Sequence, residues 1–138
     1  MLFLGIDVGS SSIKLSVLDG STGKSLGGIS FPDSELAIDS PAAGFAEQHP
    51  ETWWDCVRQG FVQLISRGGF NPKKIAAIGI SYQMHGLVLV DQNQRVLRPA
   101  IIWCDSRANT IGSKALNDLG ADYCFNHLLK SPGTFTAA

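Results

Sequence analysis

The segment of residues 5–14 combines one carboxylate with a turn rich in hydrogen-bond donors. Asp7 lies in an otherwise apolar run, and the residues that follow it are small or cationic: Gly9, Ser10, Ser11, Ser12 and Lys14. Backbone N–H groups and hydroxyls in such a turn can surround one anion, and a nearby carboxylate suits hydrated Mg²⁺. The spacing equally fits a plain Gly-Ser hairpin in which Asp7 caps its own turn. No G-x-x-x-x-G-K-[ST] pattern occurs, which excludes a Walker-type nucleotide site.

A second polar group, Gln83, Met84 and His85, follows the most apolar run of the chain. Ligands in α/β folds gather beyond the carboxyl ends of strands, where loop side chains converge. Gln83 and His85 are suited to hydrogen bonding with sugar hydroxyls, and Met84 to lining an apolar wall. The alternative is a structural histidine.

The third group lies at residues 103–107. Trp103 can stack on the apolar face of a sugar while Asp105 binds its hydroxyls. Asp105 can instead cap a following helix, with Arg107 as a solvated residue of the first turn. The spacing does not separate these readings.

The first half of the chain predicts the elements that position these groups. Strands are expected over residues 2–8, 12–18 and about 25–31, joined by tight turns into an antiparallel meander. Residues 32–49 show no period and are expected to cross the surface. A helix begins at Pro50 and ends at Gly68, with one broad apolar face for a sheet.

The second half is expected to complete a mixed sheet. Residues 75–81 form a nearly continuous apolar run, which predicts a central strand buried on both faces. Another strand is expected at 87–90, then an extended stretch over 96–103. A second helix is expected from Asp105 or Ser106 to Gly120, and its predicted inner face comprises Ile111, Ala115, Leu116 and Leu119. The order predicts an α/β or α+β fold, not a Rossmann alternation.

Composition excludes several classes of protein. The 138 residues carry a net charge of −1 without a basic stripe, which argues against nucleic acid as a partner. No run of about 18 apolar residues is present to cross a membrane. The three cysteines and three histidines are widely spaced, so reduced thiols in a cytoplasmic protein are expected and zinc is not.

Four segments together resemble the FGGY carbohydrate kinases. Residues 5–14 look like the family's first phosphate motif, and residues 50–54 like its helix start. Residues 77–86 are similar to the substrate loop of xylulokinases, and residues 96–107 follow in the same order and spacing. The Met84-His85 pair favours xylulokinase, since glycerol kinases carry Arg-Glu there.

The resemblance implies an α/β, ribonuclease-H-like (actin-like ATPase) fold with ATP and Mg²⁺ as cofactors. It places Asp7 near the Mg²⁺–phosphate region, with an indirect contact to the metal. It assigns the nucleotide phosphates to Gly9, Ser10, Ser11, Ser12 and Lys14, and the sugar to Gln83, Met84, His85, Trp103 and Asp105. Tyr82 and Cys104 depart from many relatives and leave room for a different sugar.

The resemblance also predicts what residues 1–138 lack. The family's catalytic base is an Asp in a segment beyond residue 138, and the C-terminal ATP-binding domain lies there too. Residues 1–138 are therefore expected to be one truncated N-terminal domain, inactive alone. The alternatives are a non-catalytic sugar- or partner-binding lobe, another actin-like ATPase, or a kinase for ribulose, gluconate or another polyol. Exposed apolar surface would favour a homodimer.

Overall fold

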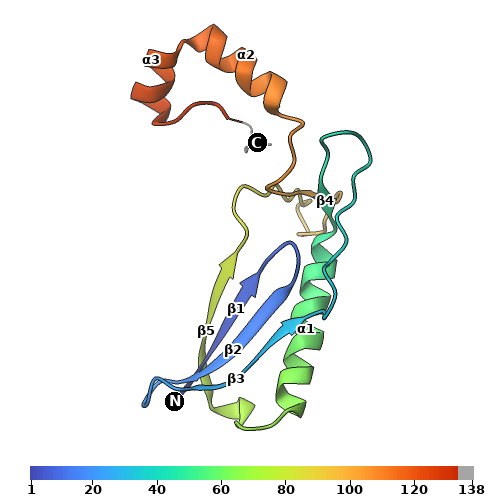
Figure 1. The fold of residues 1–138 in the computed structure, drawn as a ribbon, viewed down its shortest axis with the longest axis vertical. Coiled ribbons are helices and arrows are strands. Elements are labelled where there is room, and N and C mark those ends of the chain that lie inside the picture. Colours follow the sequence, from blue (N-terminus) through green and yellow to red (C-terminus); the bar gives the residue numbers. More distant parts are fainter. Residues whose placement is uncertain (134–138) are drawn as a thin grey trace. The chain divides into compact units, whose positions relative to one another are not determined.

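A four-stranded mixed sheet organises the first part of the chain in the computed structural model, which describes residues 1–133 (Figure 1). The strands are β1 (Leu2–Val8), β2 (Ile13–Asp19), β3 (Ser25–Phe31) and β5 (Ile75–Tyr82), in the order β3-β2-β1-β5. The first three pair antiparallel, and β5 pairs parallel to β1. The predicted meander and mixed sheet are therefore confirmed.

The described residues gather into two compact units. The first comprises residues 1–37 and 49–83, and the second comprises residues 38–48 and the chain from residue 84 onward. One domain can contain two such units, so the single domain predicted over residues 1–138 stays a prediction. Residues 134–138 of that predicted domain lie outside the described residues.

Helix α1 (Pro50–Ser66) covers one face of the first unit's sheet, as its apolar period predicts (Figure 1). His49 caps the helix through Nδ1, which accepts the Glu51 N–H at 3.3 Å, and Pro50 stands in the first turn. Gly68 follows with φ +75°, the left-handed conformation that ends helices cheaply in glycine. The alternate residues of β2 and Leu64 of α1 form the fully buried centre of this core.

Strand β5 differs from its prediction. It is the edge strand of the described sheet, and its apolar residues Ile78 and Ile80 are 58% and 64% exposed. Helix α1 packs on β2 and β3, and an apolar groove separates it from Ile78 and Ile80. A continuous apolar run indicates that both faces of a strand can be buried. It does not show whether another segment of the chain covers them. No strand of residues 1–133 pairs with the outer edge of β5, so the prediction of a central strand is wrong for the described chain.

The second unit is built on a small antiparallel pair, β4 (Glu47–Gln48) and β6 (Ala100–Ile101). The strand predicted at 87–90 is wrong, because only isolated bridges occur there, at Leu87 and Val90. Near the end of the described chain, the short helix α3 (Ala121–Tyr123) continues directly into the π-helix η2 (Cys124–Leu128). A 3₁₀ turn, η1 (Pro72–Lys74), belongs to the first unit and precedes β5.

Helix α2 (Asn109–Leu119) begins later than predicted. The side chain of Asp105 is already bonded to other residues, and the N-cap is Ala108, which makes no side-chain cap bond. Gly120 ends the helix with φ +81°, as predicted. Ile111 and Leu119 of the predicted inner face are exposed, so that part of the prediction is wrong. Amphipathic spacing identifies a face, but a partner must be present to bury it.

Close approach of α1 to the sheet depends on Gly60, and this generates a prediction about stability. A Cβ on Gly60 would lie 2.7 Å from Leu15 Cδ1 and 3.2 Å from Phe31 Cβ. We expect Gly60→Leu to lower the free energy of unfolding by about 1–3 kcal/mol, because overpacking displaces the helix. Gln59→Leu, at the exposed neighbouring position, is the matched control. Urea denaturation of the 138-residue chain measures both, and equal midpoints would contradict this packing.

Candidate functional site

The parallel pairing of β1 with β5 brings two of the sequence-predicted groups to one end of the sheet. Asp7 is in register with Ser81, and Val8 with Tyr82. The pairing continues past β5, because the Gln83 N–H donates to the Val8 carbonyl at 3.0 Å. Residues 9–12 and Gln83 therefore both follow directly from the carboxyl ends of neighbouring parallel strands, the usual location of ligands in α/β sheets.

Residues 9–12 form the tight turn of the β1–β2 hairpin. The Gly9 N–H donates to the Ser12 carbonyl at 3.1 Å, and a Cβ on Gly9 would lie only 2.9 Å from that oxygen. The turn thus requires glycine at its first position. The hairpin reading is correct for the backbone, and the Gly9 N–H is committed inside the turn. The anion-binding role predicted for this turn therefore rests on its three serines and Lys14.

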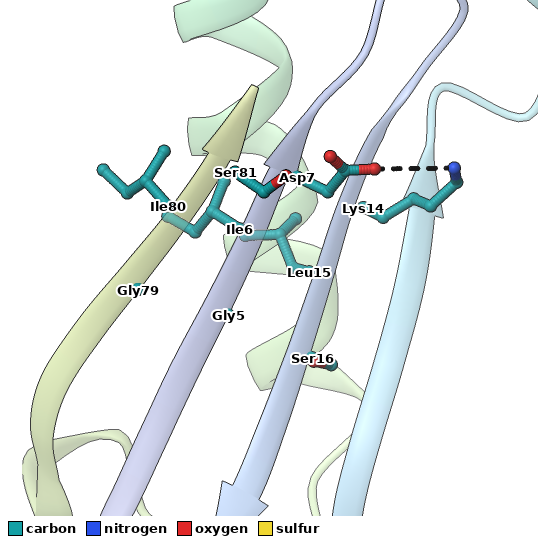
Figure 2. A pocket seen from close by; sticks show the side chains of 9 residues that line it. All are labelled: Gly5, Ile6, Asp7, Lys14, Leu15, Ser16, Gly79, Ile80 and Ser81. Carbon is teal, nitrogen blue, oxygen red and sulfur yellow. Dashed lines mark ion pairs between the residues drawn. The ribbon is translucent and has the colours of Figure 1, made fainter. Parts of the chain in front are cut away.

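Asp7 pairs with Lys14 across the hairpin and does not cap its own turn. Lys14 Nζ lies 3.6 Å from Asp7 Oδ2 (Figure 2). The Asp7 side chain is 45% exposed, so the expected cost of burying a lone carboxylate does not arise. Both side chains line a hollow of about 490 Å³ on the sheet, whose other residues include Gly5, Ser16 and Gly79. Small residues on β1, β2 and β5 leave this space open.

The donor set at this hollow fits hydrated Mg²⁺ better than a directly caged metal. Among residues 1–133 no group of three or more His, Cys, Asp or Glu side chains is placed to hold a metal ion. Mg²⁺ usually keeps several waters and takes one or two carboxylates together with substrate phosphates. A single accessible carboxylate, Asp7, beside the cation Lys14, meets that description for an indirect contact.

Gln83 has an amide group without a hydrogen-bond partner among the described residues. Its Nε2 and Oε1 are both inaccessible to water, and neither is bonded. An unpaired buried amide costs roughly 1–3 kcal/mol, so such groups usually have a hydrogen-bond partner, which can be protein, ordered water or a ligand. This is the feature of the first unit that most favours Gln83 as a binding residue.

The second unit joins the Met84-His85 segment to the Trp103 segment through β6. Ile101 pairs with Glu47 of β4 and also forms a bridge with Leu87, with N···O distances of 2.8 and 3.1 Å to Leu87. His85 adopts φ +60°, which is uncommon for a residue other than glycine. Such conformations occur often at functional sites, which favours His85 as a site residue. Met84, His85 and Trp103 are all exposed.

Asp105 is buried and bonded on both oxygens. Its Oδ2 accepts from the Ala46 N–H at 2.7 Å, and its Oδ1 from the Arg107 N–H at 2.9 Å. The Arg107 side chain adds a fork, with Nε 2.9 and 3.0 Å from the two oxygens and Nη2 2.8 Å from Oδ2. Burial alone would raise the pKa of Asp105, but these bonds lower it. Asp105 therefore caps no helix, and Arg107 is not a solvated residue.

Sequence reasoning missed the other partners of Arg107. Arg107 Nη2 lies 2.5 Å from Glu47 Oε1, which also accepts from Arg98, and the guanidinium carbon lies 3.8 Å from the centroid of the Phe45 ring. The hydrogen bond to Arg107 is the main cause that lowers the pKa of Glu47. Glu47 and Arg107 are 60 positions apart. Their pairing has no local sequence signal, since only the β4–β6 register brings them together.

The predicted site residues thus form two sets in the two units. Asp7, Lys14, Gln83 and the serine turn belong to the first, and Met84, His85, Trp103 and Asp105 to the second. The first unit thus carries a serine-rich hairpin turn between β1 and β2 and, directly after the parallel strand β5, the start of a polar loop. No helix of the described residues is long and apolar enough to cross a membrane.

Comparison with known proteins identifies the family. The model of the FGGY family of carbohydrate kinases, N-terminal domain, matches residues 2–136, and the chain belongs to this family. The chain is 36% identical over 129 residues to a xylulose kinase of Staphylococcus epidermidis, covering 92% of this chain and 25% of that protein. It therefore spans about a quarter of the length of its curated relatives.

Solved structures show the same fold. A xyloylose kinase from Brucella ovis superposes with a TM-score of 0.77 and 32% identity over 86% of this chain and 24% of its own. A gluconate kinase from Lactobacillus acidophilus gives a TM-score of 0.77 with 28% identity, over 91% of this chain and 24% of its own. The predicted α/β, actin-like ATPase fold is confirmed by these neighbours.

The lowered pKa values of Glu47 and Asp105 predict how stability depends on pH. A carboxyl whose folded pKa is depressed contributes stability above its unfolded pKa, about 4, and loses it as pH falls through the folded value. We expect the free energy of unfolding to drop from pH 6 to pH 3, and to drop less in Glu47→Gln. Urea titrations at each pH measure this, and parallel curves for the two proteins would contradict it.

Proposed function

We propose that this chain is the N-terminal part of an ATP-dependent kinase that phosphorylates a ketose, D-xylulose first, to give D-xylulose 5-phosphate. The observation that carries the proposal is the Gln83-Met84-His85 loop, which leaves β5 at the same sheet end as the serine turn after β1. Similarity to xylulose kinases over 92% of the chain supports it. We also propose a cytoplasmic location and no nucleic-acid or membrane partner.

In this proposal the side chains of the chain contact the sugar in two ways, by hydrogen bonds and by apolar contacts. The unpaired Gln83 amide donates to one hydroxyl and accepts from another. His85, held at φ +60°, presents its imidazole to a further hydroxyl. Trp103 stacks on the C–H face of the sugar and Met84 provides apolar contact. Discrimination between sugars then depends on which hydroxyls satisfy these groups.

The phosphate contacts come from the hairpin of the first unit. The hydroxyls and N–H groups of Ser10, Ser11 and Ser12 bind phosphate oxygens, and Lys14 neutralises their charge. Asp7, which pairs with Lys14 at 3.6 Å, would hold Mg²⁺ indirectly, through waters of the ion. When bound, Mg²⁺ neutralises charge on the nucleotide phosphates.

The reaction joins a sugar hydroxyl oxygen to the γ-phosphorus of ATP while the bond from that phosphorus to the ADP oxygen breaks. The hydroxyl proton passes to a base, which the family resemblance assigns to a carboxylate outside residues 1–138. The residues of this chain orient the attacking hydroxyl and hold the phosphates, which lowers the barrier by fixing the two reactants. We therefore propose that residues 1–138 alone do not catalyse transfer.

Gluconate is a second candidate substrate because of one structural comparison. The gluconate kinase from Lactobacillus acidophilus gives the same TM-score, 0.77, as the xyloylose kinase from Brucella ovis, and so does a xylulose kinase from Lactobacillus acidophilus. Gluconate carries a carboxylate in place of the ketose carbonyl region. Binding gluconate would require a cation beside His85 and Trp103, whereas a neutral ketose would not.

We expect the longest polypeptide encoded with this chain to release ADP in the presence of D-xylulose, and less or none with ribulose, gluconate or glycerol. His85→Ala should lower kcat/KM for the sugar about tenfold to hundredfold, because a hydrogen bond to a hydroxyl is lost. His127→Ala, in the π-helix and outside the candidate site, is the matched control. A coupled ADP assay measures both. Release without any sugar would favour another actin-like ATPase.

We expect the 138-residue chain by itself to give no sugar-dependent ADP release at concentrations where the longer polypeptide is active. The reason is that the base and the adenosine pocket implied by the resemblance are not among its residues. The same assay, with the longer polypeptide as positive control, decides this. Turnover by residues 1–138 alone would contradict the assignment of the base to another segment.

A further inference from the structure

A buried ionic cluster holds the Trp103 segment in the second unit. It consists of Glu47, Arg98, Asp105 and Arg107, with the Phe45 ring against Arg107, and we call it the Arg107 cluster. The side chains of Glu47 and Asp105 are only 9% and 3% exposed. Two carboxylates face two guanidinium groups, so the charges balance. A buried carboxylate is tolerated only with such partners.

A backbone hydrogen bond and the Arg107 cluster together hold the two ends of the segment that carries Trp103. On the N-terminal side, the Ile102 N–H donates to the Ala46 carbonyl at 3.0 Å. On the C-terminal side, Asp105 accepts hydrogen bonds from the Ala46 N–H at 2.7 Å and from the Arg107 side chain. The Asp105 N–H closes the turn by donating to the Ile102 carbonyl at 3.0 Å. Trp103 lies inside this closed turn while its side chain remains exposed.

The same framework extends to the Met84-His85 segment. Glu47 is the β4 residue in register with Ile101, and Ile101 also forms the bridge with Leu87, two residues after His85. An arginine is suited to this position, because its planar fork reaches Asp105 and Glu47 at once and stacks on Phe45. A lysine ammonium at the same place cannot reproduce the fork and the stack together.

We propose that Arg107 is a positioning residue that sets sugar affinity by holding Trp103 and the Met84-His85 segment in place, and that Asp105 serves it as an anchor instead of contacting the sugar. The proposal rests on the proposed sugar-kinase function. Its consequence is selective: Arg107 acts on the sugar side in the second unit, whereas the serine turn and Lys14 belong to the first. Loss of Arg107 should therefore change the sugar KM far more than the ATP KM.

The kinetic test uses the longest encoded polypeptide with Arg107→Lys. We expect the sugar KM to rise about tenfold or more, since small displacements of binding groups are costly, with the ATP KM within about twofold of wild type. Arg58→Lys is the matched control, because Arg58 makes an exposed ion pair with Asp55 on α1. A sugar KM unchanged in Arg107→Lys, or an equal rise in both KM values, would overturn the proposal. Inactive wild-type polypeptide would instead count against the proposed function.

A second measurement does not depend on activity. Amide hydrogen exchange of the 138-residue chain should be at least about tenfold faster for the Leu87 and Ile101 amides in Arg107→Met than in wild type. The double variant Glu47→Gln/Arg107→Met removes one charge of each sign and should restore part of that protection, as coupled partners do. Unchanged exchange in Arg107→Met, or no recovery in the double variant, would overturn the proposal even if no sugar substrate is found.

Discussion

The parallel pairing of β1 with β5 is the constraint on which the first unit's candidate site depends. The register Asp7–Ser81 and Val8–Tyr82 brings the exits of both strands to one end of the sheet. A shift by one residue would turn Asp7 to the opposite face of the sheet, where the buried core lies. The buried alternate residues of β1 and β2 resist that shift, because they pack under α1. Core packing therefore determines where the polar residues of the hairpin point.

In the second unit a two-residue strand replaces the large sheet as the organising element. Ile101 is paired on both sides, by Glu47 and by Leu87, and so joins three segments that are distant in sequence. So short a pairing contributes few backbone hydrogen bonds. The Arg107 cluster supplies the further interactions, and removing one partner from a buried ion pair typically costs about 3–5 kcal/mol. We infer that these charged contacts help to specify the geometry of the short pairing.

The sequence predicted the elements with a clear local signal and failed where a distant partner decides. The three N-terminal strands and α1 followed from alternation, turn residues, Pro50 and Gly68. Exposure of Ile80 was not predictable, because an apolar strand does not reveal whether a covering element is present. The capping role of Asp105 was wrong because Ala46 and Arg107 compete for its oxygens. For the site, the residue types were recognised by resemblance, but Glu47 and Arg98 were missed because only tertiary pairing connects them with Arg107.

A crystal structure of the longest encoded polypeptide with D-xylulose would test the central claim most directly, namely that residues 83–85 and Trp103 bind the sugar while Asp105 remains an anchor. The account predicts sugar hydroxyls within hydrogen-bond distance of Gln83 and His85, the Trp103 ring against the sugar, and Asp105 still bonded to Ala46 and Arg107. A sugar bound through Asp105, or bound away from His85 and Trp103, would contradict it.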